Sequence, residues 1–163
     1  MKEKTLQSLL DKIRKYPKIE KLLIYGGKIS TLFVYGYYPL FLAFAYLLKG
    51  ERDLRYIIVP AVSFVLLSFV RKLINAKRPY EKYDIMPLYK KSTKGCSFPS
   101  RHTFSAFIIG YTILMFNPYL AISVFVAGVI MAICRVLCGI HFIKDVLAGA
   151  VSAIACGIIG FII

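Results

Sequence analysis

Three residues that could do chemistry lie close together in the most apolar third of the chain: Arg135, His141 and Asp145. A charged side chain inside a membrane span is costly unless it has a partner or a function. Gly139 indicates that a helix begins near His141, so that His141 and Asp145 would lie one turn apart on the same face. The carboxylate would then orient the imidazole as a nucleophile or a base. The alternative is an ion pair that joins two spans.

Further basic and polar residues lie at the ends of two other apolar runs. Arg71 stands at the end of one run and is followed by Arg78, and the next run starts with Ser100, Arg101 and His102. The planar guanidinium group matches the oxygens of a phosphate, and the backbone amides at a helix start add further donors. These residues therefore predict a phosphate-binding site.

Taken singly, each of these basic residues has an ordinary explanation. Long basic side chains at a membrane edge often lie along the apolar surface and keep their charge in water, which applies to Arg71, Lys72, Lys77 and Arg78. The residues that surround them favour a functional site. Both histidines of the chain, His102 and His141, fall in these same stretches, and a structural arrangement would rarely gather them there.

The composition indicates an integral membrane protein. Of the 163 residues, 58% are hydrophobic, they lie in long runs, and the mean hydropathy is +0.66. The net charge of +14 suits anionic lipid headgroups or a phosphorylated substrate better than nucleic acid in such a protein. The four cysteines form no Cys-x-x-Cys pair and do not cluster with histidine, so we interpret them as small core residues and expect no metal site.

The apolar runs predict an all-α fold, an integral membrane bundle of about five transmembrane helices. The predicted spans cover residues 29–48, 54–74, 100–116, 119–137 and 145–163. Two crossings separate the polar loop 75–99 from the turn 138–144. These two connections therefore lie on the same side of the membrane, and their charged residues can meet.

The N-terminal segment, residues 1–28, is basic and carries Leu6, Leu9, Leu10 and Ile13 at helical spacing before a break at Tyr16-Pro17. This pattern predicts a pair of interfacial amphipathic helices lying on the membrane. A signal peptide is not expected, because no apolar core follows the basic start and no small-residue cleavage site is present. We expect a transmembrane domain over residues 29–163.

These groups of residues resemble the three signature motifs of the type 2 phosphatidic acid phosphatase superfamily, membrane lipid phosphatases related to the vanadium haloperoxidases. The resemblance covers about residues 16–163, with the motifs in order: Arg71 with Arg78-Pro79, then Pro99-Ser100-Arg101-His102, then Arg135, His141 and Asp145. In the third motif, five residues separate the arginine from the histidine, and three separate the histidine from the aspartate. This third motif is the specific part of the resemblance.

The chain departs from the usual pattern of this family at three positions. Arg71 replaces the usual lysine of the first motif, Arg101 the usual glycine of the second, and Cys134 the usual serine before the arginine of the third. Charge is kept in the first case and small size in the last. Only Arg101 would change the shape of the pocket.

The resemblance implies a lipid phosphatase that uses no metal and no other cofactor. His141 would attack phosphorus to give a phosphohistidine, Asp145 would hold its tautomer, and His102 would protonate the leaving oxygen. The nonbridging oxygens would be bound by Arg71, Arg78, Ser100 and Arg135, with Arg101 contributing its backbone amide and Lys72 as a further candidate. This division of roles agrees with the general needs of phosphoryl transfer, which are positioning and charge stabilisation.

The implied substrate is a lipid phosphate whose tail stays among the membrane lipids, such as a polyprenyl diphosphate of the undecaprenyl type, phosphatidate or phosphatidylglycerophosphate. Arg101 would favour a diphosphate if its side chain turns inward; the alternative is that it turns outward or pairs with Glu81 or Asp84. The resemblance places the site on the extracytoplasmic side of the cell membrane. The eight basic residues from Lys2 to Lys28 favour the opposite side.

Two other classes of function remain open from the sequence. One is a noncatalytic lipid-binding membrane protein of the same fold, which the complete set of His102, His141 and Asp145 argues against. The other is a small transporter in which Arg135 and Asp145 line a path. Transporters tend to show paired broken helices in two halves, and the sequence has no such symmetry.

Overall fold

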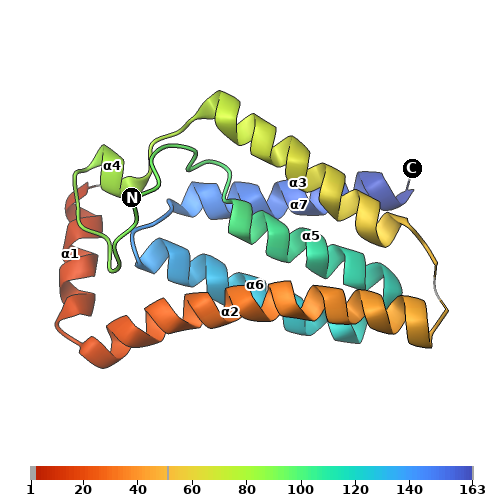
Figure 1. Cartoon of the computed structure of the whole chain (residues 1–163). Helices are drawn as coiled ribbons and strands as arrows, with labels where there is room; N and C mark the ends of the chain where they lie inside the picture. Colours follow the sequence, from red (N-terminus) through yellow and green to blue (C-terminus); the bar gives the residue numbers. More distant parts are fainter. Residues whose placement is uncertain (1–2, 51, 163) are drawn as a thin grey trace.

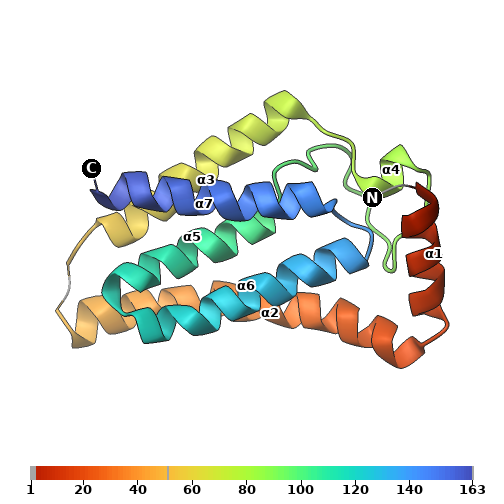
Figure 2. The same ribbon diagram turned by 180° about the vertical axis from the view of Figure 1, so that it is seen from behind.

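The computed structural model describes residues 3–50 and 52–162, which form helices and no strand. Five long helices lie side by side in Figure 1, and Figure 2 shows the same bundle from behind. They are α2 (Pro17–Ala43), α3 (Arg55–Ile74), α5 (Arg101–Phe116), α6 (Pro118–Leu137) and α7 (Ile143–Ile162). The short helices α1 (Glu3–Arg14) and α4 (Pro79–Lys82) lie at one end, and a π-helix, η1 (Phe44–Leu48), extends α2. The predicted all-α bundle is confirmed.

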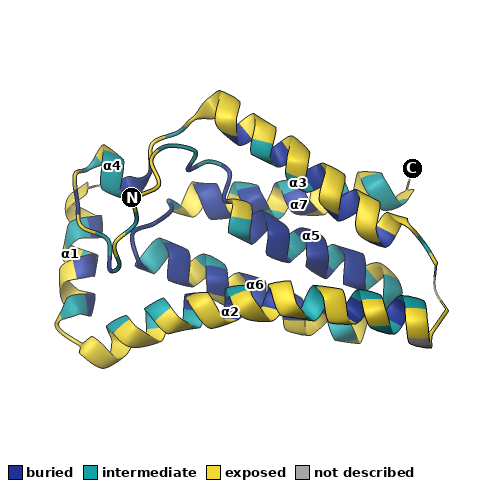
Figure 3. Cartoon of the chain, in the orientation of Figure 1, coloured by how far each residue is buried: buried dark blue, intermediate teal, exposed yellow. Residues whose placement is uncertain are grey.

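The outer surface of the bundle is suited to lipid. Within the described residues, four helical stretches are long and apolar enough to cross a membrane: 17–47, 55–82, 118–137 and 143–162. Large aliphatic side chains of these helices are exposed, for example Leu32, Leu66 and Val151. Exposed positions recur along the helices in Figure 3. A soluble monomer rarely carries such an extensive apolar surface.

Helix α5 is the centre of the bundle. Its 16 residues make it shorter than the other four long helices. It packs against α2, α3, α6 and α7, and most of its length is buried (Figure 3). The third predicted span is therefore surrounded by the other four. Its ends can then contact loops of the protein.

The N-terminal segment breaks where the sequence indicated, because α1 ends at Arg14 and α2 begins at Pro17. Proline is favoured at the first position of a helix, since its missing N–H has no intrahelical partner there. Helix α2 then runs without interruption into the first span. The boundary suggested between residues 28 and 29 lies inside this single helix. A change in hydropathy marks the edge of the lipid, and a helix can continue beyond that edge.

Helix α1 is amphipathic as predicted and covers the loops at its end of the bundle. Its buried stripe consists of Leu6, Leu10 and Ile13. These side chains pack against the α4–α5 loop and the α6–α7 turn, through Ile85, Leu88, Cys138 and Ile140. Burying one leucine side chain stabilises a fold by about 1.5–3 kcal/mol. Helix α1 thus holds both connections in place.

The α6–α7 turn takes its shape from Gly139, which has a φ of +74°. This left-handed conformation is accessible to glycine at little cost. The N–H of Ile140 donates to the carbonyl of Arg135, and that of Gly139 to the carbonyl of Val136, both at 3.0 Å. These two bonds form a Schellman closure of α6. The turn therefore places His141 at the end of the bundle, shortly after α6 has ended at Leu137.

Helices α5 and α7 approach each other closely at Gly149. A Cβ atom at this position would lie 2.6 Å from the carbonyl oxygen of Ser100 and 3.3 Å from the nitrogen of Phe104. Both are backbone atoms, which cannot rotate away. We expect Gly149→Ala to push α7 away from the start of α5 and to destabilise the protein by about 1–3 kcal/mol. The measurement is the Tm of the purified protein in detergent.

Gly36→Ala is the matched control. A Cβ atom at Gly36 meets nothing within 4 Å. Alanine also favours a helix over glycine by about 1 kcal/mol. The Tm should stay unchanged or rise in this variant, and equal losses in the two variants would contradict the close approach of α5 and α7.

Candidate active site

The side chains predicted to do chemistry meet at the end of the bundle where α1 and α4 lie (Figure 1). They come from the end of α3, the start of α5, the end of α6 and the first turn of α7. Most are almost fully buried: Arg71, Arg78, Ser100, Arg135, His141 and Asp145 are each at most 9% exposed. Buried polar groups of this kind need partners. Their contacts therefore define the site.

His141 and Asp145 form the pair that their spacing predicts, with 3.5 Å between Nδ1 and Oδ2. Helix α7 begins at Ile143, two residues after His141. The reason is a local cap: Phe142 N donates to Asp145 Oδ2 at 3.0 Å, and Asp145 N donates to the Phe142 carbonyl at 3.0 Å. This reciprocal arrangement satisfies donors at the helix start. It also fixes the carboxylate beside the imidazole.

Ser97 completes this group, although no pattern in the sequence indicated it. Its hydroxyl donates to Asp145 Oδ2 at 2.5 Å and lies 3.4 Å from His141 Nδ1. The N–H of Ser97 donates to the Ala76 carbonyl at 2.8 Å, which holds the residue in the α4–α5 loop. The available signal was a hydroxyl two residues before Pro99. Nothing in the spacing of the loop shows that this side chain turns inward.

The protonation state of His141 suits a nucleophile. Burial, opposed by the hydrogen bond with Asp145 and reinforced by the charge of Arg78, lowers the pKa of His141 to about 4. The ring is therefore neutral at neutral pH. A proton on Nδ1 satisfies the contacts with Ser97 and Asp145, and it leaves a lone pair on Nε2. Nε2 lies 3.4 Å from Arg78 Nη1, so this lone pair points at a cation.

Arg71 and Arg78 are fixed by carbonyl groups of the α4–α5 loop. Arg71 donates through Nη1 to Pro99 and through Nη2 to Cys96. Arg78 donates through Nε to Gly95 at 3.1 Å. A guanidinium group has five N–H donors, so each side chain keeps donors for a ligand. The two arginines thus shape the loop and supply positive charge.

Arg135 is held from two sides. Its Nη1 donates to the hydroxyl of Tyr89 at 3.3 Å, and its Nη2 to the hydroxyl of Thr31 on α2 at 3.5 Å. Its Nε is buried and has no hydrogen-bond partner among the described residues. A buried donor without an acceptor is costly. An anion at this position would satisfy it.

Two of the predicted ligands face away from this cluster. Lys72 is exposed beside the buried Arg71. Arg101 is also exposed, and its Cζ lies 5.6 Å from the centre of the Phe64 ring on α3. Neither Glu81 nor Asp84 forms an ion pair with Arg101 in the described part of the chain. The side chain of Arg101 therefore takes the outward direction, without an acidic partner.

Ser100 and His102 lie at the start of α5. Ser100 is buried, and its N–H donates to the carbonyl of Asp145 at 2.8 Å. Its hydroxyl accepts from Thr103 at 3.1 Å. His102 is partly buried and lies within electrostatic reach of Arg135 and His141. The structure thus brings both histidines to one site.

The site has an excess of positive charge. Within residues 3–50 and 52–162, Asp145 contacts the neutral ring of His141, and no carboxylate forms an ion pair with the arginines of the site. In the same residues, no three His, Cys, Asp or Glu side chains come together as metal ligands would. Clustered cations favour an anionic ligand. Fixed guanidinium groups facing a neutral, oriented imidazole can support transfer of a phosphoryl group.

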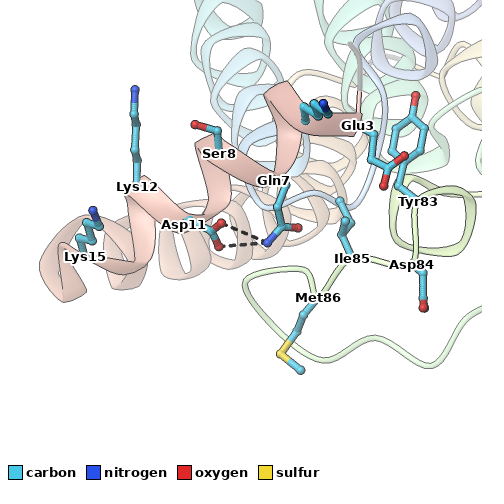
Figure 4. Close-up of a pocket in the computed structure, with 11 residues that line it drawn as sticks. Glu3, Gln7, Ser8, Asp11, Lys12, Lys15, Tyr83, Asp84, Ile85 and Met86 are labelled. Carbon is cyan, nitrogen blue, oxygen red and sulfur yellow. Dashed lines mark hydrogen bonds between the residues drawn. The ribbon is translucent and has the colours of Figure 1, made fainter.

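A hollow of about 780 Å³ on the outer side of α1 is separate from this site (Figure 4). It lies between α1 and residues 83–86. Its lining includes three carboxylates and three lysines: Glu3, Asp11 and Asp84, and Lys4, Lys12 and Lys15. Gln7 donates to both oxygens of Asp11, at 3.1 and 3.2 Å. None of the predicted catalytic residues lines it. The three carboxylates balance the three lysines, so the hollow lacks the excess of positive charge that the site has.

Comparison with known proteins gives consistent matches. The family model of the PAP2 superfamily matches residues 53–163. The bacitracin transport permease protein BcrC of Bacillus licheniformis is 26% identical over 113 residues, which cover 67% of this chain and 56% of that protein. The match therefore spans little more than half the length of that relative.

Two solved structures share the fold. LpxE of Aquifex aeolicus has 23% sequence identity and a TM-score of 0.75, and the match covers 98% of this chain and 94% of LpxE. The transmembrane PAP2 type phosphatidylglycerolphosphate phosphatase from Bacillus subtilis has 21% identity and a TM-score of 0.69, with coverage of 97% and 83%. Both similarities extend over α1 and α2, which the family model does not include.

Proposed function

Because the chain belongs to the PAP2 superfamily, we propose that it is an integral membrane lipid phosphatase that works through a phosphohistidine on His141. The observation that carries this proposal is the buried His141–Asp145 pair, whose free nitrogen Nε2 lies 3.4 Å from a guanidinium nitrogen of Arg78. The structural relative from Bacillus subtilis, a PAP2 type phosphatidylglycerolphosphate phosphatase, supports the lipid phosphatase class. The mechanism and the substrate are our proposal.

In the first step, Nε2 of His141 attacks phosphorus, and the bond between phosphorus and the lipid oxygen breaks. Asp145 and Ser97 keep the proton on Nδ1 and stabilise the positive charge that develops on the ring. Arg78 and Arg135 bind nonbridging oxygens, together with Arg71 and Ser100. The guanidinium groups supply the positive charge that another enzyme could take from a metal ion. Water then hydrolyses the phosphohistidine.

His102 is the proposed general acid for the leaving oxygen. General acid catalysis contributes about two to four decades in rate, so His102→Ala should lower kcat for a lipid monophosphate by that amount. An aryl phosphate has a much better leaving group and should lose less. The measurement is kcat on both substrates for wild type and variant. Equal losses on the two would contradict the assignment.

The lipid tail is proposed to lie between α2, α3 and α5. A groove of about 300 Å³ there has an almost entirely apolar lining, including Phe64, Pro60 and Ile109. Phe64 is the ring that Arg101 covers, so the groove begins at the edge of the site. A headgroup at the arginines could therefore keep its tail in the membrane. Substrates of this shape include polyprenyl diphosphates, phosphatidate and phosphatidylglycerophosphate.

The test of the proposed function is phosphate release by the purified protein from a panel of such lipids. Release should survive EDTA, and vanadate should inhibit it by mimicking the trigonal bipyramidal phosphorus. Strict dependence on added magnesium would contradict the proposed source of positive charge. Binding without release would favour a noncatalytic lipid-binding protein.

We also propose that the site faces the extracytoplasmic side of the cell membrane, as the family resemblance implies. Single cysteines at the exposed positions Lys94 and Arg52, at opposite ends of the bundle, can report this in a variant that lacks the native cysteines. A membrane-impermeant thiol reagent should label Lys94→Cys in intact cells and leave Arg52→Cys unlabelled. The reverse pattern would place the site in the cytoplasm, as the basic N-terminal segment favours.

A further inference from the structure

Arg135 is held by two side-chain hydroxyl groups that come from distant parts of the chain. Its Nη1 donates to the hydroxyl of Tyr89 in the α4–α5 loop at 3.3 Å. Its Nη2 donates to the hydroxyl of Thr31 on α2 at 3.5 Å. These contacts hold both terminal nitrogens of the guanidinium group. The direction of the group is therefore set by residues outside α6, the helix that carries it.

The hydrogen-bond roles at Thr31 are fixed by its own helix. Its hydroxyl donates its single proton to the carbonyl of Gly27 at 2.7 Å. The oxygen is then left as an acceptor, which suits an N–H of Arg135. Helices α2 and α6 pack closely here, since a Cβ atom at Gly27 would lie 3.1 Å from Cβ of Cys134. This close approach places Thr31 within reach of the arginine.

Tyr89 is held at its backbone and at its ring. The N–H of the preceding residue, Leu88, donates to the carbonyl of Cys138 on the α6–α7 turn at 3.1 Å. The ring packs against the buried cluster that α1, the α4–α5 loop and the α6–α7 turn form together. Burial raises the pKa of Tyr89, so its hydroxyl is neutral at neutral pH. Arg135 thus has a second fixed and uncharged acceptor.

Uncharged acceptors leave the charge of Arg135 available to a ligand. Among the described residues, no carboxylate forms an ion pair with Arg135. A guanidinium group has five N–H donors, and the two hydroxyl groups accept from two of them. The buried Nε has no partner within the described structure. The two hydroxyl groups therefore orient the guanidinium group without neutralising it, as a binding site for an anion requires.

Building on the proposed function, in which Arg135 binds a nonbridging oxygen, we propose that Tyr89 and Thr31 are positioning residues that hold Arg135 in the direction needed by the transition state. Donors that are already oriented stabilise developing charge at no cost of reorganisation. In the ground state, the other cations of the site also hold the phosphate. An interaction that is strongest in the transition state affects kcat more than KM. Loss of either hydroxyl group should therefore mainly lower kcat.

This proposal makes α2 a part of the catalytic apparatus. Helix α2 precedes residues 53–163, which are the part of the chain that the family model matches. Thr31 and Arg135 are 104 residues apart in the sequence, so no local spacing indicates their contact. The bundle brings them together through the packing of α2 on α6.

The experiment removes each hydroxyl group with little change of shape. Tyr89→Phe keeps the packed ring, and Thr31→Val keeps the branched side chain. A hydrogen bond to a charged group corresponds to about a tenfold to hundredfold effect, so Tyr89→Phe should lower kcat by that factor and change KM little. Thr31→Val should cost less, because its contact is longer. Thr31→Ser keeps the hydroxyl group and should keep kcat.

Two matched controls remove hydroxyl groups that contact no arginine. Thr112 of α5 donates to the carbonyl of Ile108 at 2.9 Å, as Thr31 does to Gly27. Tyr80 donates to the carbonyl of Thr93 within the same loop as Tyr89. Thr112→Val and Tyr80→Phe should leave kcat unchanged. The Tm of each variant in detergent shows whether it is folded.

A double-mutant cycle tests whether the hydroxyl groups act through Arg135. Arg135→Lys keeps the positive charge but replaces the guanidinium group by a single nitrogen, which cannot hold the same two contacts. In this background, Tyr89→Phe and Thr31→Val should cause little further loss of kcat. Groups that act independently would instead give losses that add.

An unchanged kcat in folded Tyr89→Phe or in folded Thr31→Val would overturn the role of that residue. A lower Tm with an unchanged kcat would assign it to the fold alone. Losses that add fully in the Arg135→Lys background, or an equal loss in Tyr80→Phe, would also contradict positioning of Arg135. In each of these cases wild type still releases phosphate, and the proposed function stands. Absence of release by wild type would contradict the proposed function and this proposal with it.

Discussion

Replacing His141 by alanine should abolish phosphate release from every lipid phosphate. The variant lacks the nitrogen that attacks phosphorus, and no other neutral imidazole lies beside Asp145 and Ser97 in the described structure. Removing the nucleophile of an enzyme that forms a covalent intermediate costs on the order of a millionfold in kcat. The measurement is phosphate release over long incubation with concentrated protein.

The fold of this variant needs its own control, since His141 is only 2% exposed. His141→Gln keeps a polar side chain near Asp145 and should be equally inactive. Size-exclusion chromatography and the Tm should show that at least one of the two variants is folded. A folded variant that retains a readily measurable fraction of the wild-type kcat would contradict the role of His141.

Replacing Asp145 by asparagine should lower kcat by about three to four decades and change KM little. Oδ2 of Asp145 accepts from Ser97, from the backbone of Phe142 and from the His141 ring. An amide of the same shape can turn its NH₂ group toward the ring and select the wrong tautomer. Ser97→Ala removes one of these contacts and should cost about tenfold to hundredfold. A larger loss in Ser97→Ala than in Asp145→Asn would contradict this order.

The pH profile separates orientation by Asp145 from a purely structural role. Burial lowers the pKa of His141, and Asp145 opposes that shift. Loss of the carboxylate charge should therefore lower the pKa of His141 further. The acid limb of kcat/KM, which reports groups of the free enzyme, should move to lower pH in Asp145→Asn. A limb that stays in place or moves to higher pH would show that Asp145 does not act on the ring.

The chemistry of the third motif could be predicted from the sequence because it is local. His141 and Asp145 are four residues apart, and the Schellman turn at Gly139 and the cap at Phe142 involve only neighbouring residues. The five long helices could also be predicted from the apolar runs, and the parity of crossings places both polar connections at one end.

The inward-facing residues of the α4–α5 loop could not be predicted. Ser97 acquires its position through hydrogen bonds to the loop backbone, such as those from its own N–H to Ala76 and from Arg71 to Cys96. No periodicity marks such contacts. For the same reason, the sequence predicted Arg71 as a phosphate ligand or as a basic side chain at the membrane edge, and did not show that it also holds the loop.

The most direct test of the mechanism is to identify the phosphorylated residue. A lipid phosphate labelled with radioactive phosphorus at the transferred group is mixed with the wild-type protein, and the reaction is quenched in alkali during turnover. Phosphohistidine survives alkali and is lost in acid, so a phosphohistidine mechanism predicts an acid-labile label on the peptide that contains His141, absent from His141→Ala. Label on a carboxylate or a hydroxyl side chain, or rapid turnover of wild type with no labelled protein at any time, would contradict it.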